Sequence, residues 1–484
     1  MNTPNVSTLL GVRRTGGEVQ PVRPCPVDVT NPASGELYAT VIGGGRDDAM
    51  LALDAADGAY DSWRQVPDVQ RAAALRRIAD RLQTEAGGDL PSIITAETGK
   101  RLAESRAELE FSAAYFRWFA AMADGARSQR WRVRPDLNHH VTAKPVGIVA
   151  VMTPWNFPVS IPARKVAPAL AAGCSVVFKP SEVAPVSGLR FAELVEAELP
   201  TNVLTTVVGP AEHISAAWTA DKRVRAISFT GSTRIGRILA GQAAGDFKRM
   251  ILELGGKASF IVLADADVTT AVESLLVAKY RNNGQSCIAA DSVFVAAELY
   301  DRFVEQFLSA ASSLQLGDPM LATTTLGPMA LPSDPARVAA LASDAESAGA
   351  ELARPTVGVP DTGYFAPPVI CLRPPPQSRI AQEEIFGPLL TISAFVDVAD
   401  VIRRTNIGRM GLAGYVVGSN IAAAQQIASQ LDIGIAGINT GTPNTPQVPF
   451  GGTKDSGLGY EGGAAGLDAF LHYQTVAVPS ELSA

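Results

Sequence analysis

The middle of the chain alternates short apolar runs, rich in β-branched residues, with amphipathic stretches. Continuous apolar runs are typical of strands buried on both faces, and a period of about 3.6 residues indicates helices. The predicted strands are residues 147–152, 175–178, 203–208, 224–229 and 250–254. The predicted helices are residues 162–172, 186–198, 211–220 and 233–245. These βα units predict a parallel sheet covered on both faces, which binds ligands beyond the carboxyl ends of its strands.

The flanking regions follow other patterns. Residues 46–122 indicate mainly helices, and the glycines at 43–45 are interpreted as a turn because no strand–helix context is predicted there. A second α/β pattern begins near Gly256, with strands at 258–263 and 292–295 and helices at 268–281 and 297–314. Short β-prone segments occur at 130–142 and 469–478. Because isolated two-stranded pieces are marginally stable, we expect these two segments to form an arm that pairs with another subunit.

Composition narrows the class of protein. The 484 residues, 47% of them hydrophobic, exceed the usual size of a single core, so two or three domains are expected. A net charge of −7 without a basic stripe argues against nucleic acid as the main partner. Four widely separated cysteines favour a reducing cytoplasm over a disulfide framework, and no metal-ligand spacing is present. We expect a cytoplasmic protein without a metal, a signal peptide or a membrane span.

Three residues could together supply chemistry at a carbonyl carbon. Cys287, Glu253 and Asn156 offer a thiol, a carboxylate and an amide donor, the nucleophile, base and oxyanion stabiliser of a thioester mechanism. Taken alone, a single cysteine is more often a small buried hydrophobic residue than a nucleophile. Glu253 ends an apolar run, where a carboxylate is either a base with a raised pKa or half of a buried ion pair.

Two further segments, each at the end of a predicted strand, offer groups for a nucleotide. Lys179 and Glu182 could hold the two hydroxyls of a ribose, although an exposed salt bridge is the commoner role of such a pair. Residues 229–236 place Gly231 and Ser232 where a phosphate can approach the N-terminus of a helix. Because the spacing is not GxGxxG, a capped turn is an equally good interpretation.

Seven short motifs occur in order along the chain. They are TPWNFP at 153–158, KPSE at 179–182, FTGST at 229–233, LELGG at 252–256, GQSC at 284–287, EEIFGP at 383–388 and PFGGTKDSGLG at 449–459. Together they resemble the motifs of the NAD(P)-dependent aldehyde dehydrogenase superfamily, and those of the succinate-semialdehyde dehydrogenase branch most of all. The resemblance covers nearly the whole chain, which makes a chance match negligible.

The resemblance implies an α/β fold of the aldehyde dehydrogenase type. A Rossmann-type NAD-binding domain would comprise residues 1–122 and 144–255, and an α/β catalytic domain residues 256–445. A β oligomerisation arm and a C-terminal tail would comprise residues 123–143 and 446–484. The family's habit of assembling through such an arm implies a homodimer or a homotetramer.

The resemblance also assigns roles. Cys287 would attack the aldehyde, Asn156 and the Cys287 backbone N–H would hold the alkoxide of the thiohemiacetal, and hydride would leave to the nicotinamide. Glu253 would then activate the water that hydrolyses the thioester. The positions that match cofactor contacts are Trp155, Lys179, Glu182, Gly231, Ser232, Glu384 and Phe386. A carboxylate at Glu182 would repel a 2′-phosphate, so NAD is expected to be preferred, with some use of NADP.

Two arginines bear on the substrate. Arg164 and Arg281 stand at positions that hold a substrate carboxylate in the succinate-semialdehyde branch, a task that suits a forked guanidinium, although each could form a structural ion pair. Asn444 stands where that branch often has serine, so succinic semialdehyde, glutaric semialdehyde or another ω-oxo acid could fit. Ala289 replaces a cysteine found in some relatives, so we expect no disulfide switch at Cys287.

Three alternatives stay open. The first is an aldehyde dehydrogenase for non-acidic aldehydes, with Arg164 and Arg281 serving structural roles. The second is a relative that passes the thioester to coenzyme A, against which Glu253 argues because hydrolysis needs that base. The third is a non-catalytic binding or structural protein on the same fold, which the joint presence of Cys287, Glu253 and Asn156 disfavours.

Overall fold

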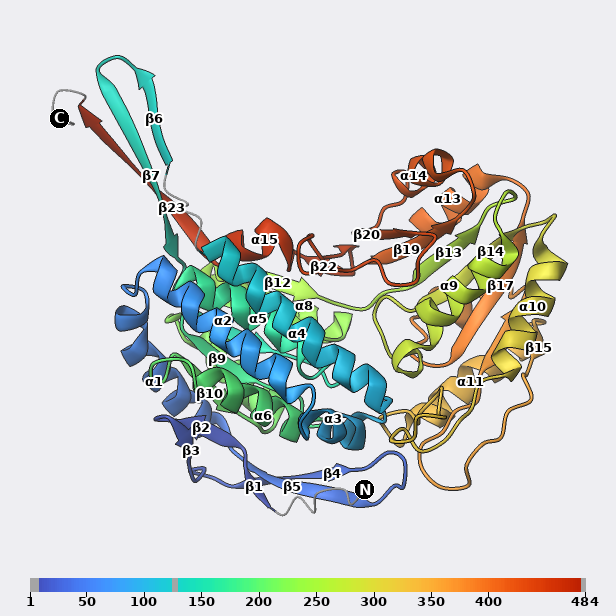
Figure 1. Ribbon diagram of the computed structural model, residues 1–484, viewed down its shortest axis with the longest axis horizontal. Coiled ribbons are helices and arrows are strands. Elements are labelled where there is room, and N and C mark those ends of the chain that lie inside the picture. Colours follow the sequence, from blue (N-terminus) through green and yellow to red (C-terminus); the bar gives the residue numbers. More distant parts are fainter. Residues whose placement is uncertain (1–7, 124–128, 480–484) are drawn as a thin grey trace.

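The computed structural model describes residues 8–123 and 129–479. Two α/β halves lie side by side, and a narrow β arm projects from the first half (Figure 1). Each half is built around its own mainly parallel sheet. This α/β architecture is the fold class predicted from the sequence.

The first half contains an eight-stranded sheet in the order β22-β12-β11-β8-β9-β10-β2-β3. Its five central strands run parallel and confirm the predicted ones. They are β8 (Ile148–Met152), β9 (Val176–Lys179), β10 (Leu204–Val207), β11 (Val224–Thr230) and β12 (Arg249–Glu253). Antiparallel strands close its two edges, with β2 (Val12–Arg14) and β3 (Gly17–Glu18) at one and β22 (Gly457–Leu458) at the other.

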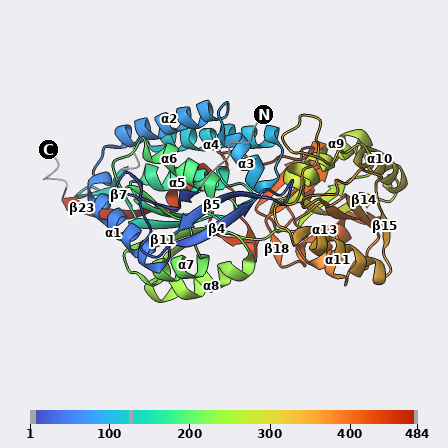
Figure 2. The same ribbon diagram turned by 90° about the horizontal axis from the view of Figure 1, so that it is seen from below.

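Helices cover both faces of this sheet (Figure 2). One face carries α2, α4, α5 and α6, and the other carries α1, α7 and α8. Strand β8 is apolar throughout because both of its faces are covered. Val149 and Val151 pack toward the helices α2, α4, α5 and α6, whereas Ile148 and Met152 pack toward α1, α7 and α8. The crossover helices are α5 (Ser160–Ala172), α6 (Pro185–Glu196), α7 (Ala211–Ala220) and α8 (Thr233–Ala243), the last followed by the 3-10 turn η1 (Ala244–Asp246).

The region before β6 is largely helical, as predicted. It comprises α1 (Arg46–Trp63), α2 (Asp68–Glu85), α3 (Leu90–Thr98) and α4 (Leu102–Ala123), preceded by a small sheet of β1 (Leu9–Leu10), β4 (Cys25–Thr30) and β5 (Leu37–Gly43). The glycines at 43–45 do lie between a strand and a helix, a context that the sequence did not indicate. The Asp48 carboxylate fills that turn, since Gly45 N–H donates to its Oδ2 at 3.3 Å. The segment is therefore a turn closed by its own helix.

The second half contains a seven-stranded sheet in the order β15-β16-β17-β14-β13-β19-β20, in which only β15 runs antiparallel. The strands are β13 (Ala258–Val262), β14 (Ala290–Ala296), β15 (Glu351–Ala353), β16 (Val369–Leu372), β17 (Leu389–Phe395), β19 (Ala413–Val417) and β20 (Ile435–Ile438). The helices are α9 (Val268–Tyr280), the 3-10 turn η2 (Arg281–Gly284), α10 (Tyr300–Ser312), α11 (Asp334–Ser347), α12 (Arg379–Gln382), α13 (Val398–Asn406) and α14 (Ile421–Ala428).

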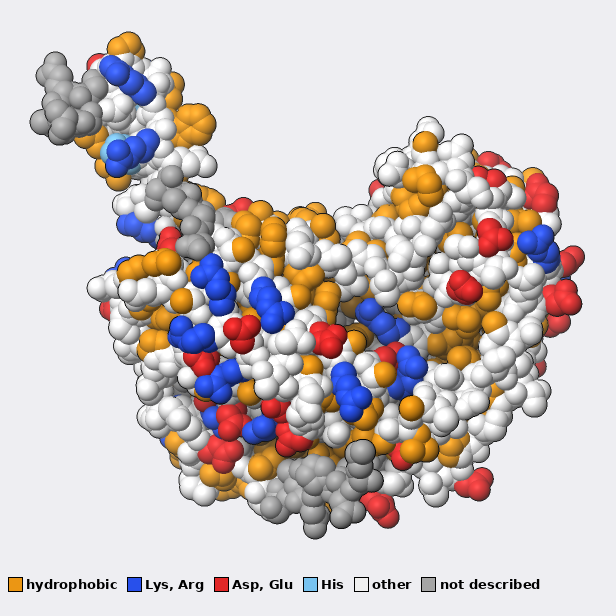
Figure 3. Space-filling model, in the orientation of Figure 1, with side chains coloured by type: hydrophobic (Ala, Val, Ile, Leu, Met, Phe, Trp, Pro, Cys, Tyr) orange, Lys and Arg blue, Asp and Glu red, His pale blue; other side chains and the backbone are white. Residues whose placement is uncertain are grey.

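The arm is a three-stranded antiparallel sheet in the order β23-β7-β6. Its strands are β6 (Gln129–Arg134), β7 (Leu137–Pro145) and β23 (Leu471–Pro479), so the two β-prone segments pair with each other within one chain. After β20 the chain returns to the arm through β21 (Thr453–Lys454), which pairs with β18 (Met410–Gly411), and then through β22 and α15 (Gly463–Asp468). Apolar side chains gather on the arm's surface (Figure 3), among them Trp131 and Val133, which are 56% and 74% exposed.

No helix in the described part of the chain combines the length and apolar content that a bilayer crossing requires. No group of three or more His, Cys, Asp or Glu side chains in residues 8–123 and 129–479 could hold a metal ion. The thiols of Cys25, Cys174, Cys287 and Cys371 are all free.

Candidate active site

The ends of neighbouring parallel strands bring several predicted residues to one edge of the first sheet. Lys179 is the last residue of β9, and Glu253 is the last residue of β12. Asn156 follows β8, and Ser232 stands between β11 and α8. Because β8, β9, β11 and β12 are parallel, these side chains share the carboxyl edge, where open α/β sheets bind their ligands.

Cys287 lies on a tight segment between η2 and β14. Asn282 and Asn283 adopt left-handed backbone angles, with φ of 51° and 58°, which turn the chain sharply before the thiol. Gly256 packs against this segment so closely that a Cβ atom there would lie 2.1 Å from the Cys287 carbonyl oxygen. The thiol is half-buried. Burial raises the pKa of Cys287 to about 12, and the nearby charge of Arg164 acts in the opposite direction.

Asn156 is held against the same segment. Its Nδ2 donates to the Gln285 carbonyl at 3.1 Å, and its own backbone carbonyl accepts from Asn282 Nδ2 at 2.9 Å. An amide NH₂ group has two N–H bonds, so one remains available to an oxyanion. Its buried Oδ1 atom has no hydrogen-bond partner among the described residues. The amide is therefore anchored at one N–H with the rest of its polar group uncommitted.

Glu253 is only 1% exposed, and neither carboxylate oxygen has a hydrogen-bond partner within the described chain. Burial and the charge of Glu461 raise the pKa of Glu253 well above its usual value, and Arg164 and Lys165 act in the opposite direction. A carboxylate with these properties can accept a proton near neutral pH. Of the two interpretations of the sequence, a base with a raised pKa fits this environment, and no ion pair to Glu253 is found in the described residues.

Lys179 and Glu182 form an ion pair of 2.7 Å at the end of β9. The Lys179 ammonium is buried and also donates to the Pro180 carbonyl at 3.1 Å. The second oxygen of Glu182 accepts from Ala211 N–H at 2.9 Å, at the start of α7. The pair thus presents a donor and an acceptor side by side, which fits the two hydroxyls of a ribose, although the salt bridge weighed as the alternative is also formed.

The turn between β11 and α8 suits a phosphate group. Ser232 caps α8 by accepting from Ile235 N–H at 3.4 Å, and a Cβ atom on Gly231 would lie 2.4 Å from the Phe229 ring. Small residues therefore leave the positive end of the helix dipole open. Glu384 lies across from this turn, where its Oε1 accepts from Gly256 N–H at 3.0 Å, and burial raises the pKa of Glu384 to about 7.

Trp155 and Phe386 meet edge to face, with ring centroids 5.8 Å apart and planes at 90°. Phe386 adopts a left-handed backbone with φ of 49°, which is costly for an aromatic residue. Arg337 holds this conformation, since it donates to the Ile385 and Phe386 carbonyls at 2.7 and 2.9 Å. The aromatic pair thus lies between the segment of Asn156 and that of Glu384.

The two arginines differ in their surroundings. Arg164 is buried and forms an ion pair with Glu461, with Nε 2.5 Å from Oε2, and it lies 4.1 Å over the Phe450 ring. Arg281 is half-buried, and its guanidinium lies over the Phe157 ring at 5.3 Å. Neither an ion pair nor a hydrogen bond joins the Arg281 side chain to another described residue. Arg164 thus has an acidic partner, as the structural alternative expects, whereas Arg281 has none among the described residues.

Asn444 is half-buried in the loop that leads to PFGG, and no hydrogen bond joins it to the other described residues. The same loop packs against α9, because a Cβ atom on Gly441 would lie 2.5 Å from the Ser274 carbonyl oxygen. Helix α9 ends directly before Arg281. The loop thus packs against the helix that directly precedes Arg281.

Sequence reasoning missed several buried charges around these groups. Glu461 joins Arg164 and Lys165, and although burial opposes its ionisation, these two cations hold the pKa of Glu461 below its usual value. A lone carboxylate in the glycine-rich segment 459–463 was the available signal. Lys100 and Glu108 form another buried pair beside the Asn156 segment. They lie far upstream, in a region for which the sequence predicted helices but no site residue.

Comparison with known proteins shows what this arrangement belongs to. The profile of the Aldehyde dehydrogenase family matches residues 21–476. The chain belongs to the aldehyde dehydrogenase family. It is 39% identical to a glutarate-semialdehyde dehydrogenase of Pseudomonas putida, over 93% of this chain and 94% of that one. It is also 39% identical to the NADP(+) succinate-semialdehyde dehydrogenase of Escherichia coli, with the same two shares covered.

Solved aldehyde dehydrogenase structures have the same fold. A succinate-semialdehyde dehydrogenase from Burkholderia pseudomallei superposes with a TM-score of 0.93 at 36% identity, over 97% of both chains. The predicted family and fold are thereby confirmed. This aldehyde dehydrogenase oxidises an aldehyde to a carboxylic acid through a cysteine thiohemiacetal and thioester, with NAD or NADP as oxidant, as its family does.

Proposed function

We propose that this enzyme oxidises a short ω-oxo acid, such as succinic or glutaric semialdehyde, with NAD preferred over NADP. The main support is the environment of Arg281. This half-buried cation lacks an acidic partner among the described residues and precedes Cys287 on the same segment. A guanidinium in that position can receive a carboxylate through two charge-assisted hydrogen bonds. The names of the Pseudomonas putida and Escherichia coli relatives, both semialdehyde dehydrogenases, support the same substrate class.

The chain's own residues would perform the following steps. The Cys287 thiol first loses its proton to solvent. Its thiolate then attacks the aldehyde carbon, and the free N–H of Asn156 together with the Cys287 backbone N–H stabilises the alkoxide. When bound, the nicotinamide supplies the hydride acceptor that turns the thiohemiacetal into a thioester. Glu253 then takes a proton from water, the hydroxide adds to the thioester carbon, and Cys287 leaves as the acid forms. The raised pKa of Glu253 suits this proton transfer.

The cofactor would lie along the carboxyl edge of the first sheet. Lys179 and Glu182 would hold the adenosine ribose, the turn at Gly231 and Ser232 the pyrophosphate, and Glu384 the nicotinamide ribose. Trp155 and Phe386 would pack beside the cofactor, as their edge-to-face contact suggests. The N–H groups at the start of α8 and the paired donor and acceptor at β9 fit these parts of a dinucleotide.

We further propose that subunits associate through the arm, into a homodimer or a homotetramer, and that the protein is cytoplasmic. Exposed apolar side chains on β6 and β23 support association because a thin three-stranded sheet buries little surface alone. The four free thiols suit a reducing compartment.

The test of the proposed substrate is an NAD-reduction assay across malonic, succinic, glutaric and adipic semialdehydes, with butanal and benzaldehyde as neutral controls. One acidic aldehyde should have the highest kcat/KM. A neutral aldehyde that outperforms every acidic one would favour the first alternative. Product formed only when coenzyme A is added would favour the second. No NAD(P)H with any aldehyde would contradict enzymatic activity altogether.

A further inference from the structure

We infer that Glu104 and Glu108, one helical turn apart on α4, are positioning residues that hold the Asn156 segment and the Cys287 segment in register. The inference rests on the proposed roles of Asn156 and Cys287. Neither glutamate is placed in contact with the reacting atoms. Each instead receives hydrogen bonds from the backbone of one of the two segments. Their spacing of four residues puts both carboxylates on one face of α4.

Glu108 holds the Asn156 side. Its Oε1 accepts from the backbone N–H groups of Val159 and Ser160 at 2.9 and 3.0 Å, where α5 begins directly after the TPWNFP segment. Its other oxygen pairs with the buried ammonium of Lys100. Lys100 Nζ in turn lies 4.0 Å from the ring centroid of Phe157, the residue after Asn156. One buried ion pair therefore contacts both the Phe157 ring and the backbone of this segment.

Glu104 holds the Cys287 side. Its Oε1 accepts from Asn282 N–H at 3.2 Å and from Arg101 at 2.9 Å. Asn282 and Asn283 both have left-handed backbones, a conformation that persists only where the surroundings over-determine it. The carboxylate on Asn282 N–H supplies part of that constraint at the residue where the turn toward Cys287 begins.

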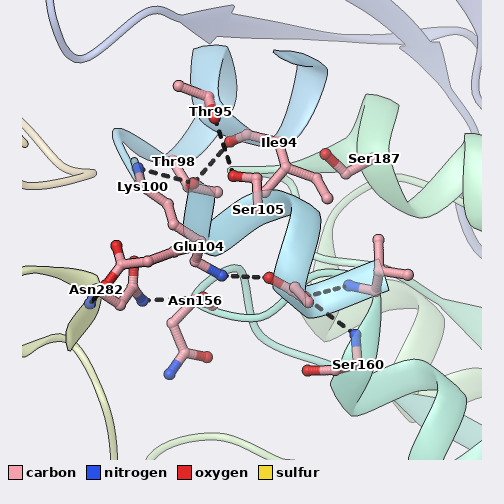
Figure 4. Close-up of polar contacts among 12 residues, drawn as sticks. Ile94, Thr95, Thr98, Lys100, Glu104, Ser105, Asn156, Ser160, Ser187 and Asn282 are labelled. Atoms are coloured by element: carbon pink, nitrogen blue, oxygen red, sulfur yellow. Dashed lines mark hydrogen bonds and ion pairs between the residues drawn. The ribbon is translucent and has the colours of Figure 1, made fainter. Parts of the chain in front are cut away.

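A ring of hydrogen bonds joins the Asn156 segment to the Cys287 segment. Asn282 Nδ2 donates to the Asn156 carbonyl at 2.9 Å and to the Gln285 carbonyl at 3.1 Å, and Asn156 Nδ2 donates to the same Gln285 oxygen. Figure 4 shows Asn282 between Glu104 and Asn156, with Ser160 on the far side. Bonds within this ring orient the amide of Asn156, and the two carboxylates on α4 tie both segments to one helix of the first half.

Helix α4 suits this task because it cannot shift easily. It runs over 22 residues and packs against α2 and α5, with Phe116 and Phe119 fully buried. A displacement of about 1 Å at a reacting centre can cost about 100-fold in rate. Loss of the hydrogen bonds to Glu104 or to Glu108 should therefore reduce kcat more than it reduces cofactor binding, since the cofactor residues lie on other elements.

The first test compares Glu104→Ala, Glu104→Gln and the control Glu110→Ala, whose exposed carboxylate is also on α4. Glu104→Ala should lower kcat by roughly 10- to 100-fold with an unchanged KM for NAD and an unchanged Tm. Glu104→Gln keeps an acceptor for Asn282 N–H and should restore most of the activity, and Glu110→Ala should resemble the wild type. A full kcat for Glu104→Ala, or no recovery with glutamine, would overturn the inference.

The second test separates positioning from folding at the buried pair. Glu108→Leu removes the acceptor of the Val159 and Ser160 N–H groups, but it also leaves the Lys100 ammonium unpaired and can unfold the protein, so the double variant Lys100→Met, Glu108→Leu is measured beside it. The double variant should recover most of the lost Tm but keep a reduced kcat, and alkylation of Cys287 by iodoacetamide, followed on its peptide by mass spectrometry, should change in rate. A stable double variant with full kcat and an unchanged alkylation rate would overturn the role of Glu108.

Failure of this inference can be told apart from failure of the proposed function. The wild type must form NAD(P)H from an aldehyde, and Cys287→Ala and Asn156→Ala must abolish or strongly reduce that activity. If these controls fail, the proposed catalytic roles are wrong. If they hold while Glu104→Ala and the double variant behave as the wild type, only the positioning role is wrong.

Discussion

The Arg164 guanidinium and the Glu461 carboxylate form a buried ion pair, with Nε 2.5 Å from Oε2. Although burial opposes the charge of Arg164, Glu461 raises the pKa of the guanidinium above its usual value. Arg281 has no comparable partner in the described residues, so two arginines that look equivalent in sequence have different electrostatic surroundings. We therefore predict that Arg164 contributes mainly to stability and Arg281 mainly to substrate binding.

Arg281→Ala should therefore act on the substrate. We expect the KM for an acidic semialdehyde to rise about 10-fold or more, because a charge-assisted hydrogen bond contributes about 1.5–3 kcal/mol. The KM for butanal should be unaffected. Steady-state kinetics with both aldehydes measures the contrast, and an equal change for the two would contradict the anchor.

Arg164→Ala should act on stability instead. It leaves Glu461 buried with Lys165 as its remaining partner, and removal of one member of a buried pair costs about 3–5 kcal/mol. We expect a clear fall in Tm by calorimetry at pH 7, whereas Arg281→Ala should keep the wild-type Tm. A stable Arg164→Ala enzyme whose KM rises only for acidic aldehydes would instead make Arg164 a second anchor.

Glu253 should give the enzyme a pH-dependent balance between stability and activity. Because its folded-state pKa is raised, the unfolded carboxyl ionises first as pH rises, and this group destabilises the fold increasingly above an unfolded pKa of about 4.3. Glu253→Gln should thus raise Tm at pH 8 and lose that advantage toward pH 4. Calorimetry across this range measures the effect, and an advantage that grows as pH falls would contradict the sign.

The same variant should separate the two chemical steps. With Glu253 replaced by glutamine, thioester formation can proceed while hydrolysis is blocked, so rapid mixing should show a burst of NAD(P)H without turnover. In the wild type, the hydrolytic rate should fall as the pH is lowered through the raised pKa, because the base becomes protonated. Full turnover of Glu253→Gln at neutral pH would exclude this residue as the base.

Glu182 should set cofactor preference. Its carboxylate would lie beside the ribose 2′-position, so Glu182→Gln should raise kcat/KM with NADP relative to NAD, by about 10-fold for the loss of one like-charge contact. The wild type should prefer NAD. The comparison uses initial rates with each cofactor at saturating aldehyde. A wild type with equal or higher kcat/KM for NADP would contradict the assignment.

The fold could be predicted to a large extent, because the sheet strands are apolar on both faces and their ends carry distinctive turns. Strand β12 and helix α7 differ from their predicted bounds by at most one residue. Arg164 shows where sequence reasoning stops. Its acidic partner Glu461 is nearly 300 residues downstream, and such a long-range pair leaves no local pattern.

Glu104 and Glu108 are a second case in which the sequence does not show that a charged side chain is buried. Their spacing within a helical, charge-rich stretch is typical of a solvated surface, yet Glu108 is 5% exposed and faces the Asn156 segment. Burial of a charge depends on which helix packs against it, and this is decided by the tertiary arrangement of α4 and α5. Catalytic candidates were more accessible to prediction because their residues stand at strand ends and in short glycine turns.

The strand that carries Glu253 also has a consequence for how the enzyme is made. One neighbour of β12 is β11, but the other is β22, which pairs Glu253 with Gly457, and Leu254 N–H is satisfied by the Ser456 carbonyl at 2.9 Å. A nascent chain therefore exposes this apolar strand edge on the ribosome until residues beyond Leu458 emerge. The strand that bears the base thus gains its second neighbour only after a segment far downstream has been made, and a chain that stops before Gly457 would leave this edge open to non-native strand pairing.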